Sequence, residues 1–292
     1  MRKLSVSRKT FLIINTVFCL FVGIVCFMPV LHVLALSFSA KNPVESGNVY
    51  FWPVGFNTDN YVLVARDAQF YRSYLVSFIR VILGLLAGML TTVLAAYPMS
   101  MSRTKFHSRG IYVIIFMIPM FFSGGLIPNY LVVNGLGMID TIWALIIPGA
   151  VSTFDIILMM NFMKELPDAI REAAYIDGAG HFKTLFRIVL PLCKPSLATV
   201  SLFIVLGHWN SWFDGMIYIR SQNLKPLQTY LRSIVVVNSA IQNQTIENML
   251  SKYSTDGANA AKIFLAMIPI FCFYPFVQKY FVKGLVYGSV KE

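Results

Sequence analysis

The sequence predicts an all-α integral membrane protein with about six transmembrane helices. The first reason is composition, because 57% of the 292 residues are hydrophobic and only 13% are charged. Soluble domains carry about 25% charged residues. The second reason is that the apolar residues gather in separate runs, and each transmembrane helix needs about 20 of them. The third is that basic residues collect beside these runs on one predicted side of the membrane.

Polar segments separate the apolar runs, which sets the expected span boundaries. The first run is too long for the apolar region of a signal peptide and is followed by no clean cleavage site, so we expect it to be retained. The six spans are predicted at residues 11–37, 74–99, 110–133, 140–163, 196–218 and 260–281.

The net charge of +11 follows the positive-inside rule and does not indicate nucleic-acid binding. With both termini in the cytoplasm, the cytoplasmic segments hold 15 of the 24 basic residues. No nucleic-acid partner is expected, and the bilayer is the predicted environment. The four cysteines are neither paired as CxxC nor joined by a histidine cluster, so neither a disulfide framework nor a metal site is expected.

Several spans contain helix breakers. Pro119 and Pro128 interrupt the third, with two glycines between them; Pro148 and Gly149 interrupt the fourth, and Pro269 the sixth. Backbone groups freed at such places need partners from neighbouring protein or water. Broken helices occur along transport pathways, and prolines are also frequent in ordinary membrane helices.

A helix–turn–helix is predicted over residues 165–191, between the fourth and fifth spans. Pro167 and Asp168 suit a helix start. The apolar residues that follow at helical spacing on one side are Ala169, Ile170, Ala173, Ala174 and Ile176. Gly178 and Gly180 end the helix. A second amphipathic piece then runs to Pro191. The pattern fits a helix that sits in a partner's groove, and it equally fits an amphipathic pair lying in the membrane interface.

The sequence of this segment, EAA followed by DGA and then IVLP, resembles the EAA loop of binding-protein-dependent ABC importer permeases. The resemblance extends from about Tyr74 to the C-terminus. It implies the type I ABC importer permease fold and a cytoplasmic helix that docks into a cleft of an ATP-binding subunit. The coupling residues that it implies are Glu172, Ala173, Ala174, Asp177, Gly178 and Ala179. Beside them, Arg171 and Arg187 are expected either to form salt bridges at the rim or, as we favour, only to reflect the positive-inside bias.

The GGLIP stretch at 124–128, LGMIDT at 136–141 and the C-terminal YFVKGLVYGSVK are similar to the carbohydrate-uptake branch of these importers. Within it the chain resembles permeases for alginate- or pectin-derived oligosaccharides. The implied partners are a second, probably different, permease, two ATP-binding subunits, an extracytoplasmic solute-binding protein and an oligosaccharide. The implied location is the bacterial cytoplasmic membrane.

This resemblance also implies a division of the chain. Residues 1–73 would form the first helix and a long extracytoplasmic loop, and residues 74–282 the core transmembrane domain with its coupling loop at 164–195. Residues 283–292 would form a cytoplasmic tail. The long outer segment 219–259 is rich in amides and is either a contact for an extracytoplasmic partner or a solvated connector.

Polar and aromatic residues within the spans are candidates for the substrate path. Charged groups are costly in lipid and should face the bundle or water. Aromatic rings that pack on sugar faces, beside amides and carboxylates, suit carbohydrates, although an interfacial aromatic belt has the same composition. The candidates are Asn129, Tyr130, Asp155, Trp209, Asn210, Trp212 and Asp214. Arg80 is expected to pair with Asp155, to meet an anionic substrate, or to snorkel to the surface.

No nucleotide-binding, metalloprotease or nucleophile-elbow motif is present. We therefore expect a non-catalytic subunit with no cofactor of its own, and ATP and magnesium on a partner ATPase. The alternatives are an ABC permease for a peptide, a polyamine or an anion, and a membrane enzyme, sensor or secondary transporter outside the ABC class.

Overall fold

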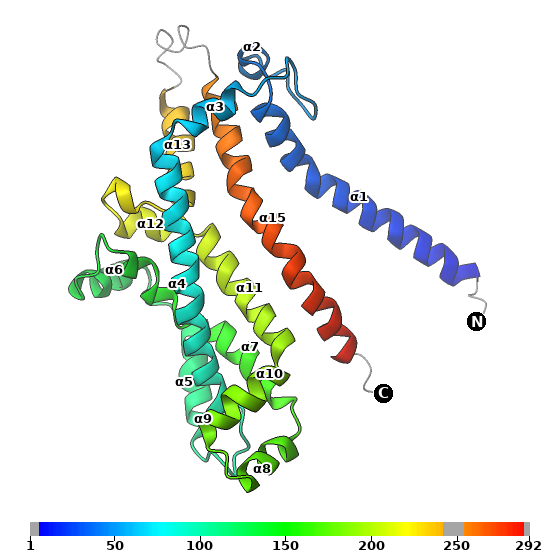
Figure 1. Cartoon of the computed structure of the whole chain (residues 1–292), viewed down its shortest axis with the longest axis vertical. Coiled ribbons are helices and arrows are strands. Elements are labelled where there is room, and N and C mark those ends of the chain that lie inside the picture. Colours follow the sequence, from blue (N-terminus) through cyan, green and yellow to red (C-terminus); the bar gives the residue numbers. More distant parts are fainter. Residues whose placement is uncertain (1–5, 242–253, 289–292) are drawn as a thin grey trace. The chain divides into compact units, whose positions relative to one another are not determined.

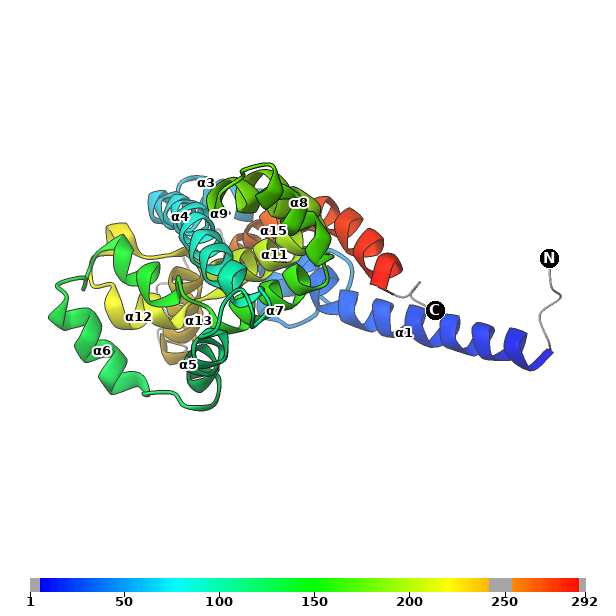
Figure 2. The ribbon, with the colours of Figure 1, turned by 90° about the horizontal axis from the view of Figure 1, so that it is seen from below.

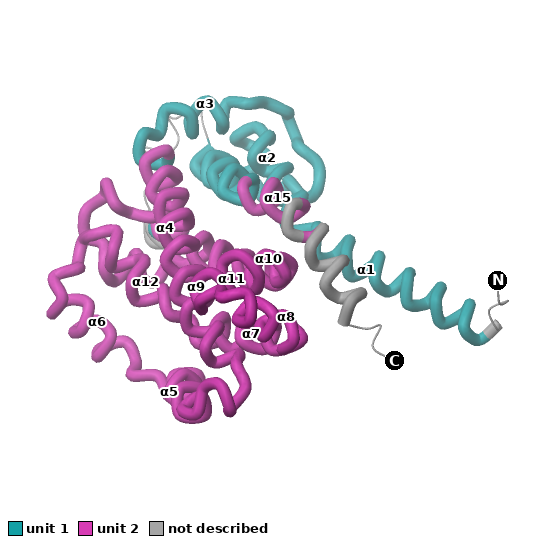
Figure 3. The backbone as a smooth tube through the Cα atoms, turned by 60° about the horizontal axis from the view of Figure 1, so that its bottom comes forward, with its two compact units in different colours: residues 1–70, 233–268 teal, residues 71–232, 269–292 magenta. Residues whose placement is uncertain are grey.

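The computed structural model describes residues 6–241 and 254–288. Within these ranges every regular secondary-structure element is a helix. The chain forms two compact units (Figure 3). Unit 1 comprises residues 1–70 and 233–268, and unit 2 comprises residues 71–232 and 269–292. The boundaries between them fall inside three helices, α4, α13 and α15.

Unit 1 contains the first predicted span and the segment that follows it. Asn60 fixes the turn after that span, because its Nδ2 donates to the carbonyls of Ser37 at 3.0 Å and Ser39 at 3.3 Å. An ion pair of 2.5 Å joins Lys262 to Asp67 in the same unit. The elements that begin in unit 1 are α1 (Val6–Ser37), α2 (Lys41–Glu45), α3 (Asp59–Ala65), α15 (Thr255–Gly288) and the first residues of α4.

Unit 2 holds the second to fifth predicted spans and the predicted helix–turn–helix, and the sixth predicted span is divided between the two units. Its helices are α4 (Ala68–Met99), α5 (Arg109–Phe121), α6 (Leu126–Gly135), α7 (Thr153–Lys164), α8 (Asp168–Ile176), α9 (His181–Thr184), α10 (Leu190–Leu192), α11 (Lys194–Asn210), α12 (Phe213–Tyr218) and α13 (Leu227–Ile241). Between them lie the short 3₁₀ helices η1 (Ile142–Leu145), η2 (Ile147–Gly149) and η4 (Gln222–Leu224) and the π-helix η3 (Leu185–Val189). Figure 1 shows α8 and α9 at the end of unit 2 where α4 finishes and α5 begins.

The described helices agree with a multi-span protein. Three are long and apolar enough to cross a membrane by themselves, at Ser7–Ser37, Ala68–Met99 and Thr255–Pro275. Up to six spans result if each of three bent helix pairs counts as one. The predicted breaks in the third and fourth spans are therefore present. The predicted interruption of the sixth span is wrong, because Pro269 lies inside the continuous helix α15.

The break in the third span lies at its glycines. Pro119 is inside α5 and does not end it. The helix stops at Phe121, Gly125 takes a φ of +82°, and α6 begins with its axis bent 115° from that of α5. Figure 2 shows the result, with α5 seen nearly end-on and α6 running across the view. Glycine accepts this backbone conformation without the steric cost that a Cβ brings.

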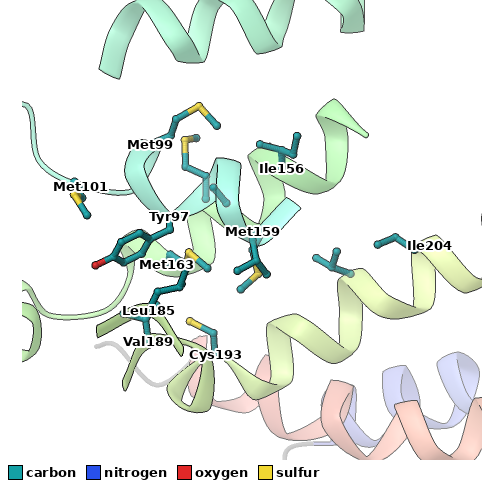
Figure 4. Packing of buried hydrophobic residues seen from close by; sticks show 14 residues of the cluster. Tyr97, Met99, Met101, Ile156, Met159, Met163, Leu185, Val189, Cys193 and Ile204 are labelled. Atoms are coloured by element: carbon teal, nitrogen blue, oxygen red, sulfur yellow. The ribbon is translucent and has the colours of Figure 1, made fainter. Parts of the chain in front are cut away.

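The core of unit 2 lies where α4, α7 and α11 meet, and it is rich in methionine (Figure 4). Flexible thioether side chains fill irregular gaps between helices that do not run parallel. The buried cluster consists of Val93, Ala96, Tyr97, Met99, Met101, Ile156, Met159, Met160, Met163, Leu185, Val189, Cys193, Val200 and Ile204.

Candidate functional site

The predicted helix–turn–helix is present at one end of unit 2. Helix α8 starts directly after Pro167, as expected for a proline at a helix start, and Asp168 lies in its first turn. It ends at Ile176, and Gly178 then adopts a φ of +74°, the left-handed conformation that ends many helices. The chain reverses there and continues into α9.

One side of α8 is fixed to the rest of unit 2 by Arg171. Its side chain is only 2% exposed. Nη2 donates to the Met163 carbonyl at 2.6 Å and to Ser100 Oγ at 3.1 Å, and Nη1 donates to the Ser100 carbonyl at 3.4 Å. Of the roles considered for Arg171 from the sequence, a salt bridge is found only as the 3.7 Å contact with Asp168, and the main partners of Arg171 are the buried Ser100 and Met163. Arg171 is buried because α8 turns this side chain toward the ends of α4 and α7.

Two further contacts hold the same helix. Glu172, which is exposed, pairs with Lys105 at 3.0 Å, and that lysine comes from the segment between α4 and α5. The Tyr175 hydroxyl lies 3.2 Å from the hydroxyl of Tyr97 and 3.1 Å from Nδ1 of His181. Helices α4, α8 and α9 are thereby linked through one chain of polar side chains.

The opposite side of the helix pair is exposed and partly apolar. Ile176 is 86% exposed and Phe182 is 72% exposed, and Phe186 follows on the same segment at half exposure. The six residues implied to couple divide between the two sides. Glu172, Ala173, Asp177 and Gly178 are exposed, whereas Ala174 and Ala179 are buried. The expectation that Ala174 and Ile176 share one face is wrong, since one packs inward and the other points to solvent.

A second polar cluster surrounds Arg80, near the break between α11 and α12. The guanidinium forms an ion pair with Asp214, donates to the Ser211 carbonyl at 3.2 Å, and lies with Nε 3.5 Å from Nδ1 of His208. The predicted pairing of Arg80 with Asp155 is therefore wrong. Asp155 is buried at the start of α7, and its Oδ1 has no hydrogen-bond partner among the described residues.

This cluster provides hydrogen-bond donors for the backbone carbonyls at the helix break, as a break inside a membrane span requires. The Ser211 carbonyl, freed where α11 stops, accepts from Arg80, and the Trp212 carbonyl accepts from Thr229 Oγ1 at 2.8 Å. Asp214 in turn accepts from Ser211 Oγ and from the Gly215 N–H, each at 2.8 Å. Gly84 leaves the space for His208, because a Cβ at Gly84 would overlap the imidazole.

The aromatic candidates separate across the same break. Trp209 is buried and packs edge-on against Tyr74 and Phe78. Trp212 is 37% exposed, and the Arg232 guanidinium lies over its ring at 5.2 Å. Asn210 is exposed, so the structure brings Asn210 and Trp212 to a surface and leaves Trp209 in the packing.

The remaining candidates lie on α6. Asn129 is exposed, and the Tyr130 ring stacks on Tyr218 with centroids 6.3 Å apart. Asp140 ties this region together, since its Oδ1 accepts from the backbone N–H groups of Arg220 and Ser221, both at 2.9 Å. Asp140 itself has a φ of +61°, in the left-handed region.

Sequence reasoning missed His208 and Arg232, and it missed the buried position of Arg171. His208 and Arg232 carry no motif, and their roles depend on partners distant in the sequence. Arg171 had one available signal. An arginine at the residue before EAA, three positions after a helix-starting Asp168, falls on the same helix face as Ala174.

Comparison with known proteins assigns the family. The model of the family "Binding-protein-dependent transport system inner membrane component" matches residues 69–223. Protein LplC of Bacillus subtilis (strain 168) is 36% identical over 287 residues, which cover 98% of this chain and 96% of the relative. The polygalacturonan/rhamnogalacturonan transport system permease protein YtcP of the same organism is 36% identical over 275 residues, covering 94% of this chain and 96% of the relative.

A solved structure is similar over nearly the whole chain. It is the crystal structure of a bacterial ABC transporter involved in the import of the acidic polysaccharide alginate, with a TM-score of 0.86 and 30% identity. The match covers 96% of this chain and 100% of that one. The chain therefore belongs to the family of inner membrane components of binding-protein-dependent transport systems, the permease subunits of ABC importers.

Proposed function

We propose that this permease forms half of the translocation path of an ATP-driven importer and is coupled to an ATPase subunit through α8 and α9. The observation that carries the proposal is the exposed apolar pair Ile176 and Phe182 on either side of the Gly178 turn. Large apolar side chains grouped at an exposed tip gain free energy when a partner removes them from water. Exposed Ala173 lets a partner surface approach the helix closely.

The partner ATPase would supply the chemistry. The chain has no nucleotide-binding motif, so ATP and magnesium belong on two ATP-binding subunits. Closure of these subunits would pull α8 and α9 and rock this permease against a second one, opening the cavity alternately to each side. This arrangement puts the helix pair and both termini in the cytoplasm of a bacterium, and a solute-binding protein on the other side of the membrane.

The coupling proposal is tested by placing charge on the exposed tip. Ile176→Asp and Phe182→Asp in the complex with its partner chains should each weaken ATPase attachment on the order of thirtyfold, the loss typical of a central interface residue. The measurements are the amount of ATPase that copurifies and the hydrolysis stimulated by the binding protein. His107→Asp adds the same charge to an exposed residue outside the helix pair and should change neither. Normal attachment of both tip variants would refute the proposal and favour a helix pair that lies in the membrane interface.

We also propose that the solute is an oligosaccharide. Support comes from the relatives described above and from the surface beside the α11–α12 break, where Asn210, Trp212 and Arg232 are exposed together. An aromatic face packs on a sugar ring, while amide and guanidinium groups bond hydroxyl or carboxylate oxygens. Asp214 and Asp155 would act from inside, the first by holding the break and the second as a buried polar group of the path.

The solute is tested with the binding protein of the same system. We expect ATP hydrolysis in proteoliposomes to be stimulated by the binding protein loaded with oligogalacturonate or a neutral oligosaccharide, and not with a peptide or a polyamine. Trp212→Ala should then reduce uptake of the sugar, whereas Trp143→Ala, at another exposed tryptophan, should not. Stimulation by a peptide or polyamine alone would replace the sugar with that solute class and leave the coupling proposal intact.

A further inference from the structure

Arg171 occupies a place where two helices end. Ser100 follows the last residue of α4, and Met163 lies in the last turn of α7. The last four carbonyls of a helix have no partner inside that helix and carry the negative end of its dipole. A buried cation reaching both ends satisfies these carbonyls and meets favourable potential from two helices at once.

The geometry of the guanidinium suits this double contact. Its two terminal nitrogens donate to three oxygens, the two carbonyls and Ser100 Oγ, from a planar group with fixed donor directions. Asp168, one turn earlier on α8, lies 3.7 Å away and adds a weaker, largely exposed counter-charge. The remaining polar contacts of α8, from Glu172 and Tyr175, join it to side chains near α4 and to α9, and none of them reaches α7.

We propose that Arg171 is a positioning residue that makes α8 move as one rigid piece with the ends of α4 and α7, so that force on α8 reaches two spans together. This rests on the proposed coupling through α8 and α9. Without the double contact, α8 could turn while the two spans stay where they are. The ATPase would then still bind and hydrolyse ATP, and less solute would be moved for each ATP.

The test uses the full complex in proteoliposomes with Arg171→Lys and Arg171→Met. Lysine keeps the charge but offers one compact ammonium group, which cannot hold two helix ends in the guanidinium geometry. We expect both variants to keep the copurifying ATPase and to lower the solute transported per ATP roughly 2- to 30-fold, the range of coupling changes seen for residues between sites. Arg187→Lys and Arg187→Met, at an exposed arginine of the same segment, should leave that ratio unchanged.

A second measurement reports directly on the position of α8 relative to the end of α4. Spin labels at exposed Ala169 on α8 and exposed Thr104 beyond α4 report the distance between the two elements. We expect this distance distribution to broaden in both Arg171 variants and to stay narrow in the Arg187 variants. A narrow distribution, or an unchanged transport ratio despite a broad one, would overturn the proposal. Failure of the coupling proposal can be told apart from these outcomes, because ATPase attachment would then be unaltered in Ile176→Asp.

Discussion

Arg80 and Arg171 are equally buried, each at 2% exposure, yet the protein balances their charges by different means. Arg80 meets a carboxylate, Asp214, together with an imidazole and one freed carbonyl. Arg171 meets chiefly carbonyls and a hydroxyl at two helix ends, and its carboxylate partner is more than half exposed. A cation inside the spans thus has a matched anion, whereas near the predicted membrane surface the dipoles of helix ends serve in its place.

This comparison predicts unequal costs when each cation is removed. Arg80→Met should lower the free energy of unfolding by about 3–5 kcal/mol, because Asp214 remains as an uncompensated charge. Arg171→Met should cost about 1–3 kcal/mol, because it leaves neutral acceptors on the buried Ser100 and Met163 without their donor. Unfolding of the purified chain in mixed micelles with increasing denaturant measures both. Arg72→Met, at an exposed arginine near the start of α4, is the control and should cost less than either.

Equal losses for the two buried arginines would contradict the distinction drawn here. The paired replacement Arg80→Met with Asp214→Leu sharpens it further. This double variant should recover part of the loss, and should not recover all of it, since the Ser211 carbonyl and His208 still lack their donor.

The cluster around Arg80 should also be less tolerant of added volume. Gly84→Ala would push a methyl group into His208 and should cost about 1–3 kcal/mol by overpacking. Gly207→Ala is a matched control within α11, where a Cβ would have no heavy atom within 4 Å. It should be neutral or stabilise by up to about 1 kcal/mol, because alanine has the higher helix propensity. The same unfolding titration compares them, and a harmless Gly84→Ala would show that His208 moves aside without cost.

The smallest expected effect concerns Asp140, which holds its neighbours by hydrogen bonds without a buried ion pair. The Ser221 backbone N–H lowers the pKa of this carboxyl most; partial desolvation opposes it, and the Arg220 N–H, the Ser221 hydroxyl and the Arg220 charge lower it further. A pKa lowered by folding contributes stability above the unfolded value of about 3.9, and that stability is lost as the pH falls toward the folded value.

Unfolding of the wild-type chain should therefore become easier as the pH drops below about 4 in part because of Asp140. Asp140→Asn tolerates the same left-handed backbone and should weaken this dependence while leaving the contacts of Arg171 untouched. The measurement is the unfolding midpoint of both chains across this acidic range. An identical pH dependence would show that the hydrogen bonds to Asp140 add nothing to stability.

Local features could be predicted from the sequence because they depend on few neighbouring residues. The start of α8 at Pro167 and Asp168 and the turn at Gly178 follow from helix-start and left-handed preferences. The EAA segment identified the family for a similar reason, since its spacing is contained in one stretch. The share of the chain assigned to each domain, and the coupling and substrate roles of single residues, stay predictions.

Contacts between distant residues could not be predicted. Asp155 and Asp214 both lie in predicted spans, and only the path of α11 and α12 brings Asp214 to Arg80. Trp209 and Trp212 stand three residues apart, and the helix end between them sends one inward and the other outward. The sharp turn between α5 and α6 depends on Gly125, whereas Pro119, an equally prominent helix breaker, leaves its helix intact.

The methionine-rich core next to α8 has a chemical consequence. Met99, Met159 and Met163 have essentially no exposed surface and line the region where α4 and α7 end. Oxidation turns the apolar thioether of methionine into a polar sulfoxide and requires that an oxidant reach the sulfur. The rate at which peroxide oxidises these three sulfurs, read by mass spectrometry, would therefore report whether the core opens while the transporter turns over.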